Sequence, residues 1–378
     1  MFFSLNKSIL NVIKTIENAG GEAYLVGGCV RDMLLSLSPC DFDITTSLPP
    51  EKILTLFEKT VATGIKHGTV TVVMDNMNIE VTTYRTDGNY CDSRHPEDVH
   101  FVKSLKEDLA RRDFTVNAIA YNPKVGIVDE FGGLNDLKLK LLRTVGDPYK
   151  RFSEDALRIL RLFRFSCQLG FTAHEATMEA ALKSANDLKN ISRERIASEL
   201  FKALISPYPK RLSPLIQTGA LSFCGIEKGS ISDDITLLPL DRDIRFYKFL
   251  YDCASEHITV CKELKTDNKL LHFCSEVNAL ISSPPANESE CKLALKDFSS
   301  KAVTAALLLT NSDSSMVERI LSSKQPYRIK DLAVTGDDLK SVGMDGKEVG
   351  QALEFLIRHV IEHPEDNVKK VLLSIISK

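Results

Sequence analysis

The fold of the N-terminal part is decided by the stretch GGCVRD at residues 27–32, together with DFD at residues 41–43. The apolar run Ala23–Val26 ahead of it predicts a short strand, and the glycine pair predicts a tight turn into a helix. Because Gly28 has no Cβ atom, backbone N–H groups there can approach an anion, and Arg31 adds a charged fork for the same phosphates. The stretch therefore predicts a strand–turn–helix unit that binds phosphate.

Asp41 and Asp43 form a carboxylate pair, because residues two apart on an extended chain point to the same side. Two carboxylates this close repel each other unless a cation lies between them, and Mg²⁺ suits such hard oxygen ligands. Glu80 lies in the β-branched run Asn78–Tyr84, and we expect it to be the third carboxylate of a two-metal site. A DxD sequence alone is commonly a solvated loop, but its combination with the glycine turn and Glu80 indicates a catalytic site.

The sequence around this unit predicts a mixed α/β domain. Thr69–Met74 and Asn78–Tyr84 flank a polar turn, as expected for a hairpin, and Ile119–Tyr121 and Ile127–Val128 are further short strand candidates. Beyond residue 150 the strand signals almost vanish, and apolar residues recur at helical spacing. We predict an α+β protein with four parts: a mixed-sheet head (1–145), a helical neck (146–205), a helical body (206–300) and a helical tail (301–378).

A helix with a ribbon of arginines follows the head. Ser153 is its predicted N-cap, and helical spacing of apolar residues continues from Glu154 to Leu169. Upstream, Arg112 suits a phosphate contact, and either Asp113 or Asn117 can hold a ribose hydroxyl. Polar residues recur every three positions beside the apolar stripe of the helix, which favours a cleft wall: Asp155, Arg158, Arg161 and Arg164.

The Asp155–Arg158 pair offers a way to select bases without a nucleic-acid template. Cytosine and adenine each present an amine donor beside a bare ring-nitrogen acceptor, and guanine and uracil present the reverse pattern. A carboxylate accepts from the amine, and a guanidinium donates to the ring nitrogen. The pair therefore predicts acceptance of C and A and rejection of G and U.

Composition and charge are those of an ordinary globular protein. The net charge is −3, so any binding of nucleic acid must rest on local basic patches. No unbroken apolar run reaches membrane-spanning length, and charged residues interrupt the N-terminal apolar pattern. Nine cysteines without a CxxC pair argue against a zinc site and a disulfide framework. We expect a cytosolic protein with no membrane partner, and the sequence does not decide its oligomeric state.

Eight motifs are spaced over nearly the whole chain. They are GGCVRD…DFD (27–43), IEVTTYR (79–85), DGNYCDSRHP (87–96), EDLARRDFTVNA (107–118), RTVGDPYKRFSEDALRILRLFRF (143–165), RERIASELFKAL (193–204), LKTDNKLL (264–271) and LAVTGDDLKSVGMDGKEVGQALEFLIRHV (332–360). In this order they resemble the class II tRNA nucleotidyltransferases, which share the polymerase β-like superfamily with bacterial poly(A) polymerases.

The resemblance implies a polymerase β-like nucleotidyltransferase head that adds C, C and A to the 3′ end of tRNA from CTP and ATP. Asp41 and Asp43 would hold Mg²⁺, with Glu80 as the third carboxylate. The loop Asp87–Pro96 matches one needed for the terminal A, and His95 stands where relatives often carry arginine. Nucleotide-binding roles are implied for Gly28, Arg31, Arg112, Asp155, Arg158, Arg161 and Arg164.

The helical half is implied to bind and measure tRNA. Some members of the superfamily carry a phosphohydrolase domain built on a His-Asp dipeptide, and none of the eight histidines here is followed by Asp. Three alternatives stay open: an A-only tRNA-adding enzyme, a poly(A) polymerase, and an RNA-binding protein whose transferase head has decayed. Candidate contacts with the RNA backbone form two groups: Lys202, Lys210 and Arg211, and Lys292, Lys296 and Lys301.

Overall fold

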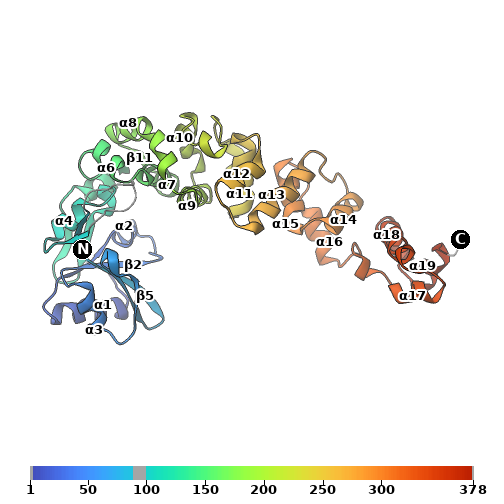
Figure 1. Cartoon of the computed structure of the whole chain (residues 1–378), viewed down its shortest axis with the longest axis horizontal. Helices are drawn as coiled ribbons and strands as arrows, with labels where there is room; N and C mark the ends of the chain where they lie inside the picture. Colours follow the sequence, from blue (N-terminus) through green and yellow to red (C-terminus); the bar gives the residue numbers. More distant parts are fainter. Residues whose placement is uncertain (1–2, 88–98, 377–378) are drawn as a thin grey trace. The chain divides into compact units, whose positions relative to one another are not determined.

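The computed structural model describes residues 3–87 and 99–376 (Figure 1). The chain forms two compact units, Met1–Thr236 with Asp252–Ala254, and Leu237–Tyr251 with Ser255–Lys378. In the described ranges every strand belongs to the first unit and the second unit is helical, so the predicted α+β fold is confirmed. The finer division into head, neck, body and tail stays a prediction.

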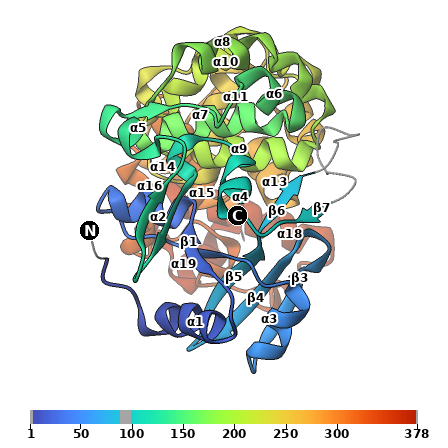
Figure 2. The same cartoon turned by 90° about the vertical axis from the view of Figure 1, so that its left-hand side faces the viewer.

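The core of the first unit is a seven-stranded mixed sheet in the order β3-β4-β5-β2-β1-β8-β9 (Figure 2). Strand β2 runs parallel to β5, and the other neighbours are antiparallel. The strand bounds are β1 (Ala23–Val26), β2 (Phe42–Thr46), β3 (Thr60–Gly64), β4 (Thr69–Met74), β5 (Met77–Thr83), β8 (Ile119–Asn122) and β9 (Gly126–Asp129).

The hairpin β4–β5 has the predicted position but a tighter turn. Met74 pairs with Met77, which leaves only Asp75 and Asn76 in the turn. Their φ angles are 49° and 61°, in the left-handed region that aspartate and asparagine tolerate better than most residues. This short turn fixes the register of β4 against β5, and therefore fixes which side chains of β5 face each side of the sheet.

One face of the sheet is apolar and covered by two helices. Leu25, Ile44 and Val81 share this face through the β1–β2 and β2–β5 registers, and all three are buried. The amphipathic helix α1 (Lys7–Asn18) packs on β1, and α3 (Pro50–Leu56) packs on β4 and β5 (Figure 2). Burial of this apolar face supplies the hydrophobic stabilisation of the sheet.

The other face carries Asp43 and is only partly covered. Helix α4 (Leu105–Ala110) closes it over β1 and β8, where Leu109 packs with Val26 and Ala120. The remaining elements of the first unit, apart from 3₁₀ turns, are α2 (Gly28–Leu34), β6 (Arg85–Asp87), β7 (Val99–Phe101), α5 (Gly133–Leu139), β10 (Leu141–Leu142), α6 (Pro148–Glu154), α7 (Leu157–Leu169), β11 (Thr172–Ala173), α8 (Glu175–Lys183), α9 (Arg193–Leu204) and α10 (Ser213–Gln217).

The arginine helix begins differently from its prediction. Two helices, α6 and α7, replace the single one, and Ser153 lies inside α6, where its hydroxyl donates to a backbone carbonyl three residues earlier (2.8 Å). The predicted N-cap at Ser153 is therefore wrong. Pro148 starts α6 earlier, because its fixed φ suits the first turn of a helix. Asp155 then breaks the helix with an extended backbone, and its carboxylate accepts the N–H of the first residue of α7 (3.0 Å).

The second unit consists of short helices. A buried apolar cluster at its C-terminal end includes Leu339, Leu356 and Val360. The proline-containing segment 282–287 connects α13 to α14 inside this unit. The helices are α11 (Arg242–Cys253), α12 (His257–Glu263), α13 (Asn268–Ile281), α14 (Glu288–Asp297), α15 (Ser300–Leu309), α16 (Ser315–Ser322), α17 (Gly336–Ser341), α18 (Lys347–Glu362) and α19 (Lys369–Ile376).

All eight cysteines among the described residues are free, and only Cys40 of these is exposed. No helix in the same ranges combines the length and apolarity that crossing a membrane requires.

Candidate active site

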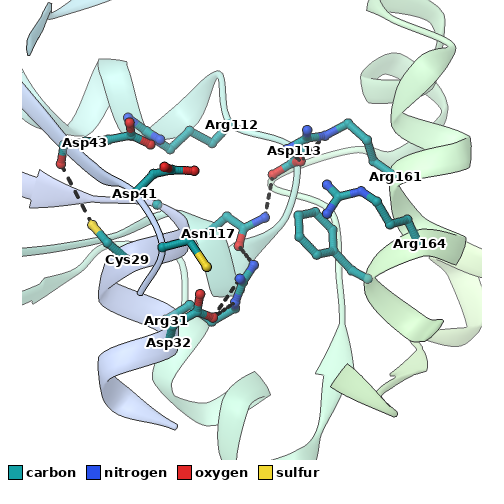
Figure 3. Close-up of a pocket in the computed structure, with 14 residues that line it drawn as sticks. Cys29, Arg31, Asp32, Asp41, Asp43, Arg112, Asp113, Asn117, Arg161 and Arg164 are labelled. Carbon is teal, nitrogen blue, oxygen red and sulfur yellow. Dashed lines mark hydrogen bonds and ion pairs between the residues drawn. The ribbon is translucent and has the colours of Figure 1, made fainter. Parts of the chain in front are cut away.

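A polar cavity of about 350 Å³ opens where helix α2, the start of β2, the segment after α4 and helix α7 meet (Figure 3). Seven of the predicted site residues line it: Gly28, Arg31, Asp41, Asp43, Arg112, Arg161 and Arg164. The others that line it are Gly27, Cys29, Asp32, Cys40, Asp113, Asn117 and Phe165. The fold thus brings together residues from four separate parts of the sequence.

The glycine turn shapes one wall of this cavity. Gly27 has a φ of 80°, in the region that favours glycine. A Cβ atom at this position would lie 3.2 Å from Nη1 of Arg112. A side chain here would therefore strain the backbone and crowd the arginine, which explains why the turn needs a glycine before α2.

The carboxylates Asp41, Asp43 and Glu80 are neighbours, because β2 and β5 place Asp43 beside Glu80. Asp41 and Asp43 line it, and together with Glu80 they also line a neighbouring cavity of about 570 Å³. Burial raises the pKa of Asp43 to about 6, Arg112 opposes this rise, and the charges of Glu80 and Asp41 add to it. The three acidic groups therefore repel one another in the protein alone.

A cation bound between the carboxylates would relieve this repulsion, and carboxylate oxygens are suitable ligands for a hard divalent ion. In residues 3–87 and 99–376, however, no three histidine, cysteine, aspartate or glutamate side chains form a group that could hold a metal ion as they stand. The donor chemistry and the raised pKa of Asp43 fit a divalent cation, and the side chains would have to draw together around it.

Arg112 is held in place by Asp108, a residue that the sequence reasoning missed. Asp108 has a fully buried side chain and accepts from Nη2 of Arg112 (3.3 Å) and from Arg111 (2.9 Å). The hydroxyl of Thr45 on β2 also donates to it (3.1 Å). These contacts hold the pKa of Asp108 below its usual range, against the effect of burial. The spacing of an acid three and four residues before two arginines was the available signal.

A chain of hydrogen bonds joins α2 to α7 across the cavity (Figure 3). Arg31 donates to the carboxylate of Asp32 (2.7 Å) and to the amide oxygen of Asn117 (2.8 Å). The amide of Asn117 donates to Asp113 (3.0 Å), which also accepts from Nη2 of Arg161 (2.6 Å). Burial acts to raise the pKa of Asp113, but Arg161 and the hydrogen bonds hold it well below its usual range. Asp113 and Asn117 are thus partners of the two arginines.

Phe165 is a second residue that the sequence reasoning missed. Its ring is buried, and it lies among three guanidinium groups, whose carbons are 3.9 Å (Arg164), 5.0 Å (Arg31) and 5.3 Å (Arg161) from the ring centroid. Cations within about 6 Å of an aromatic face are attracted by it. The ring therefore stabilises a cluster of like charges at one wall of the cavity. A phenylalanine in an apolar helix stripe gives no sequence signal of this role.

Asp155 and Arg158, the predicted base-selecting residues, each have a separate partner within the protein. Asp155 accepts from Arg195 of α9 (3.0 Å), and Arg158 forms an ion pair with Glu154. The break between α6 and α7 separates them, because Asp155 is not in helical conformation. Neither side chain lines the cavity of Figure 3. Arg158 nevertheless lies next to it, since its Nη2 donates to the carbonyl of Arg111 (3.2 Å).

The predicted loop and the predicted basic RNA contacts lie away from this cavity or outside the described residues. The predicted loop Asp87–Pro96, with His95, lies outside the described residues except for Asp87, which ends β6. Lys210 pairs with Asp233 within the first unit. The prediction for Lys292 as an RNA contact is wrong, because this side chain is buried and its Nζ donates to the carbonyl of Ile361 at the end of α18 (3.5 Å). The other basic candidates stay predictions.

Two family models match parts of the chain. The model described as the Poly A polymerase head domain matches residues 23–143. The model described as the probable RNA and SrmB-binding site of polymerase A matches residues 170–224. The first match includes the glycine turn, the pair Asp41 and Asp43, and Glu80.

Similar proteins and structures extend over nearly the whole chain. It is 37% identical to the CCA-adding enzyme of Pediococcus pentosaceus, over 97% of this chain and 96% of that protein. It is 36% identical to the CCA-adding enzyme of Enterococcus faecalis, with 98% and 96% covered. The Bacillus stearothermophilus CCA-adding enzyme, solved in complex with CTP, superimposes with a TM-score of 0.84 at 31% identity, with 98% and 96% covered. The Thermotoga maritima CCA-adding enzyme, solved with tRNA_CCA, shares the fold with a TM-score of 0.72 at 22% identity, with 99% and 96% covered.

Proposed function

Because this chain belongs to the family of CCA-adding enzymes, we propose that it completes the 3′ end of tRNA by adding C, C and A from CTP and ATP. The proposed reaction joins the 3′ oxygen of the RNA to the α-phosphorus of the nucleotide and breaks the bond to the β-phosphate. Pyrophosphate leaves, and the hydroxyl loses its proton. No nucleic-acid template takes part.

The observation that supports this proposal most directly is that carboxylates and arginines line the same cavity. Asp41 and Asp43 line the same cavity as Arg31, Arg161 and Arg164. A nucleoside triphosphate needs cationic groups along its phosphates and carboxylates near the reacting phosphorus. The cavity offers both within the size of a small-molecule site.

We propose Mg²⁺ as the divalent cation, held by Asp41 and Asp43 with Glu80 as the third carboxylate. When bound, such ions neutralise charge on the reacting phosphate and lower the pKa of the attacking hydroxyl. The chain itself contributes positioning. Arg112 stands beside the carboxylates, and the anchored Arg31 and Arg161 orient the phosphates, so that the reacting atoms meet without further reorganisation. Gly28 leaves room for the phosphates at the turn.

We propose that Asp155 and Arg158 select the base. Each carboxylate oxygen of Asp155 has two lone pairs, so its bonds to the backbone and to Arg195 leave acceptor capacity for an exocyclic amine. The contact with Arg195 also fixes the direction of that carboxylate. A guanidinium has five N–H donors, so Arg158 keeps donor capacity for a ring nitrogen beside its contacts with Glu154 and with the carbonyls of Arg151 and Arg111.

Replacing Asp155 or Arg158 by alanine is expected to relax base choice by roughly 10- to 100-fold, the range for losing one good bidentate base contact. The measurement is the ratio of kcat/KM for CTP to that for UTP, and for ATP to that for GTP, on purified variants. Lys150→Ala, an exposed change on α6, serves as the control and should leave both ratios unchanged. Unchanged ratios in the Asp155 and Arg158 variants would refute their role in selection.

The experiment that tests the function uses three tRNA transcripts, ending before CCA, after C and after CC. Purified protein with Mg²⁺ receives CTP and ATP, separately and together, and products are resolved at single-nucleotide length. We expect all three transcripts to be extended to a complete CCA end, after which addition stops. Extension of only the CC-ended transcript by one A would instead identify an A-only enzyme, and long A tails would identify a poly(A) polymerase.

The absence of any incorporation would favour an RNA-binding protein with an inactive head.

We also propose a cytosolic location, because the free cysteines of the described chain suit a reducing compartment.

A further inference from the structure

Four residues form a row across one face of the sheet. The register places Asp43 of β2 beside Glu80 of β5, and Glu80 beside Thr71 of β4. Thr71 in turn pairs with Val61 of the edge strand β3. Because side chains directly opposite in register lie on the same face, this row runs from the carboxylates to the edge of the sheet. Asn78, two residues before Glu80, shares the same face.

Within residues 3–87 and 99–376, nothing covers the exposed side chains of this part of the face. Along β5, Asn78 and Glu80 are exposed while the alternate residue Ile79 is fully buried. Val61, at the edge-strand end of the row, is 48% exposed, whereas Thr71 within the row is 7% exposed. Seven residues line a cavity of about 570 Å³ over this surface: Asp41, Phe42, Asp43, Val61, Thr71, Asn78 and Glu80.

The two cavities share Asp41 and Asp43 but differ in charge. The nucleotide cavity is lined by four arginines. Among the described residues that line the cavity over β3, β4 and β5 there is no arginine or lysine, and there are three carboxylates. A polyphosphate would be repelled by such a surface. Hydroxyl and amine groups, which donate hydrogen bonds to carboxylates and amides, would be accepted by it.

Nucleotidyl transfer requires one site for the triphosphate and a second site for the attacking hydroxyl. In phosphoryl and nucleotidyl transfer the attacking and leaving oxygens lie roughly in line, on opposite sides of the phosphorus. If the triphosphate lies among the arginines, the attacking hydroxyl must approach the shared aspartates from the other side. The cavity over β3, β4 and β5 is the described surface that meets the same two aspartates.

We propose that this cavity is the acceptor subsite, which binds the 3′-terminal nucleoside of the RNA. This inference rests on the proposed function. The ribose hydroxyls lie toward Glu80 and the shared aspartates, the amide of Asn78 binds a polar edge of the nucleoside, and the exposed methyl groups of Val61 contact the face of its base. Asn78 and Val61 are thus specificity residues for the acceptor and not for the incoming nucleotide.

The test is a steady-state comparison of Asn78→Ala, Val61→Ala and the wild type, with a CC-ended tRNA as acceptor and ATP as nucleotide. Each variant is expected to raise KM for the tRNA by about three- to tenfold, the loss of one hydrogen bond or one apolar contact. KM for ATP should stay unchanged. Both residues are exposed, so the unfolding temperature should also stay unchanged. Val125→Ala, at an exposed valine before β9, is the matched control and should alter neither constant.

A second measurement distinguishes a loss of acceptor binding from a general disturbance of the fold. The dinucleotide CpC, used as an inhibitor, should compete with tRNA and not with ATP in the wild type, and its inhibition constant should rise in both variants. A rise in KM for ATP with no change for tRNA, or CpC inhibition unaffected by both substitutions, would overturn the acceptor subsite. Failure of the wild type to extend tRNA at all would instead overturn the proposed function, so the two failures are distinguishable.

Discussion

Replacing Asp43 by asparagine is expected to reduce nucleotide incorporation by at least roughly a thousandfold. Loss of a carboxylate ligand removes several kcal/mol of charge stabilisation at the reacting phosphate, and each 1.36 kcal/mol corresponds to about tenfold in rate. Asparagine has nearly the same shape, so the loss would not come from unfolding. The measurement is single-turnover addition of A to a CC-ended tRNA at saturating Mg²⁺.

The same substitution is expected to stabilise the metal-free protein. Burial and the neighbouring carboxylates raise the pKa of Asp43 from 3.8 to about 6 in the folded state. The folded state then binds protons more tightly than the unfolded state, so its stability falls as pH rises from about 4 to about 6. Above pH 6 the charged carboxylate costs roughly 1–3 kcal/mol, allowing for solvent screening of this partly exposed group, and asparagine removes that cost.

We therefore expect Asp43→Asn to unfold at a higher temperature than the wild type in EDTA at about pH 7.5, with the difference gone near pH 4. Mg²⁺ should stabilise the wild type more than the variant, because a ligand raises stability only where it binds the folded state. The control is Asp337→Asn, at an exposed carboxylate of the second unit, which should change neither activity nor stability. Normal turnover by Asp43→Asn would contradict the metal assignment, and lower stability in EDTA would contradict the electrostatic argument.

Replacing Asp113 by alanine is expected to destabilise the first unit by about 3 kcal/mol, which is the lower end of the range for breaking a buried ion pair. Asp113 is 7% exposed and accepts hydrogen bonds from Arg161, from Asn117 and from the backbone N–H of Phe114. Without it, the guanidinium of Arg161 keeps its charge among other arginines and lacks its partner. The side chain of Arg161 is 34% exposed, so water moderates the penalty.

The pH dependence of this effect has the opposite sign to that of Asp43. The pKa of Asp113 is held well below 3.8 in the folded state, so its stabilisation is fully present above the unfolded pKa and declines as pH falls below it. The difference between wild type and variant should be constant from about pH 5 to 8 and shrink toward about pH 2. The difference in free energy of unfolding is measured by chemical denaturation, from the unfolding transition of the first unit. Asp32→Ala, at a partly exposed ion pair with Arg31, is the matched control, with an expected cost of about 1 kcal/mol or less.

An equal loss of stability in Asp113→Ala and Asp32→Ala would show that burial of Asp113 does not increase its contribution to stability. A stable Asp113→Ala protein with normal nucleotide affinity would show that Arg161 does not need this anchor.

The local features of the site could be predicted from the sequence. The glycine turn, the β-branched hairpin and the side-by-side placement of Asp41 and Asp43 depend on backbone geometry within a few residues. The arginines of α7 could likewise be placed on one helix, because their spacing follows the helical period. The sequence also predicted the α+β fold and the family, which the similar proteins confirm.

The partners of these residues were decided by the tertiary structure. Glu80 lies beside Asp43 only because β2 pairs in parallel with β5 in one register, and a shift of one residue would turn Glu80 to the apolar face. Arg161 meets Asp113 across 48 residues of sequence. Asp155 and Arg158 were predicted to lie on one helix, and the break between α6 and α7 instead gives each its own partner within the protein. Local periodicity determines which way a side chain points, whereas burial of apolar surface and strand register determine what it meets.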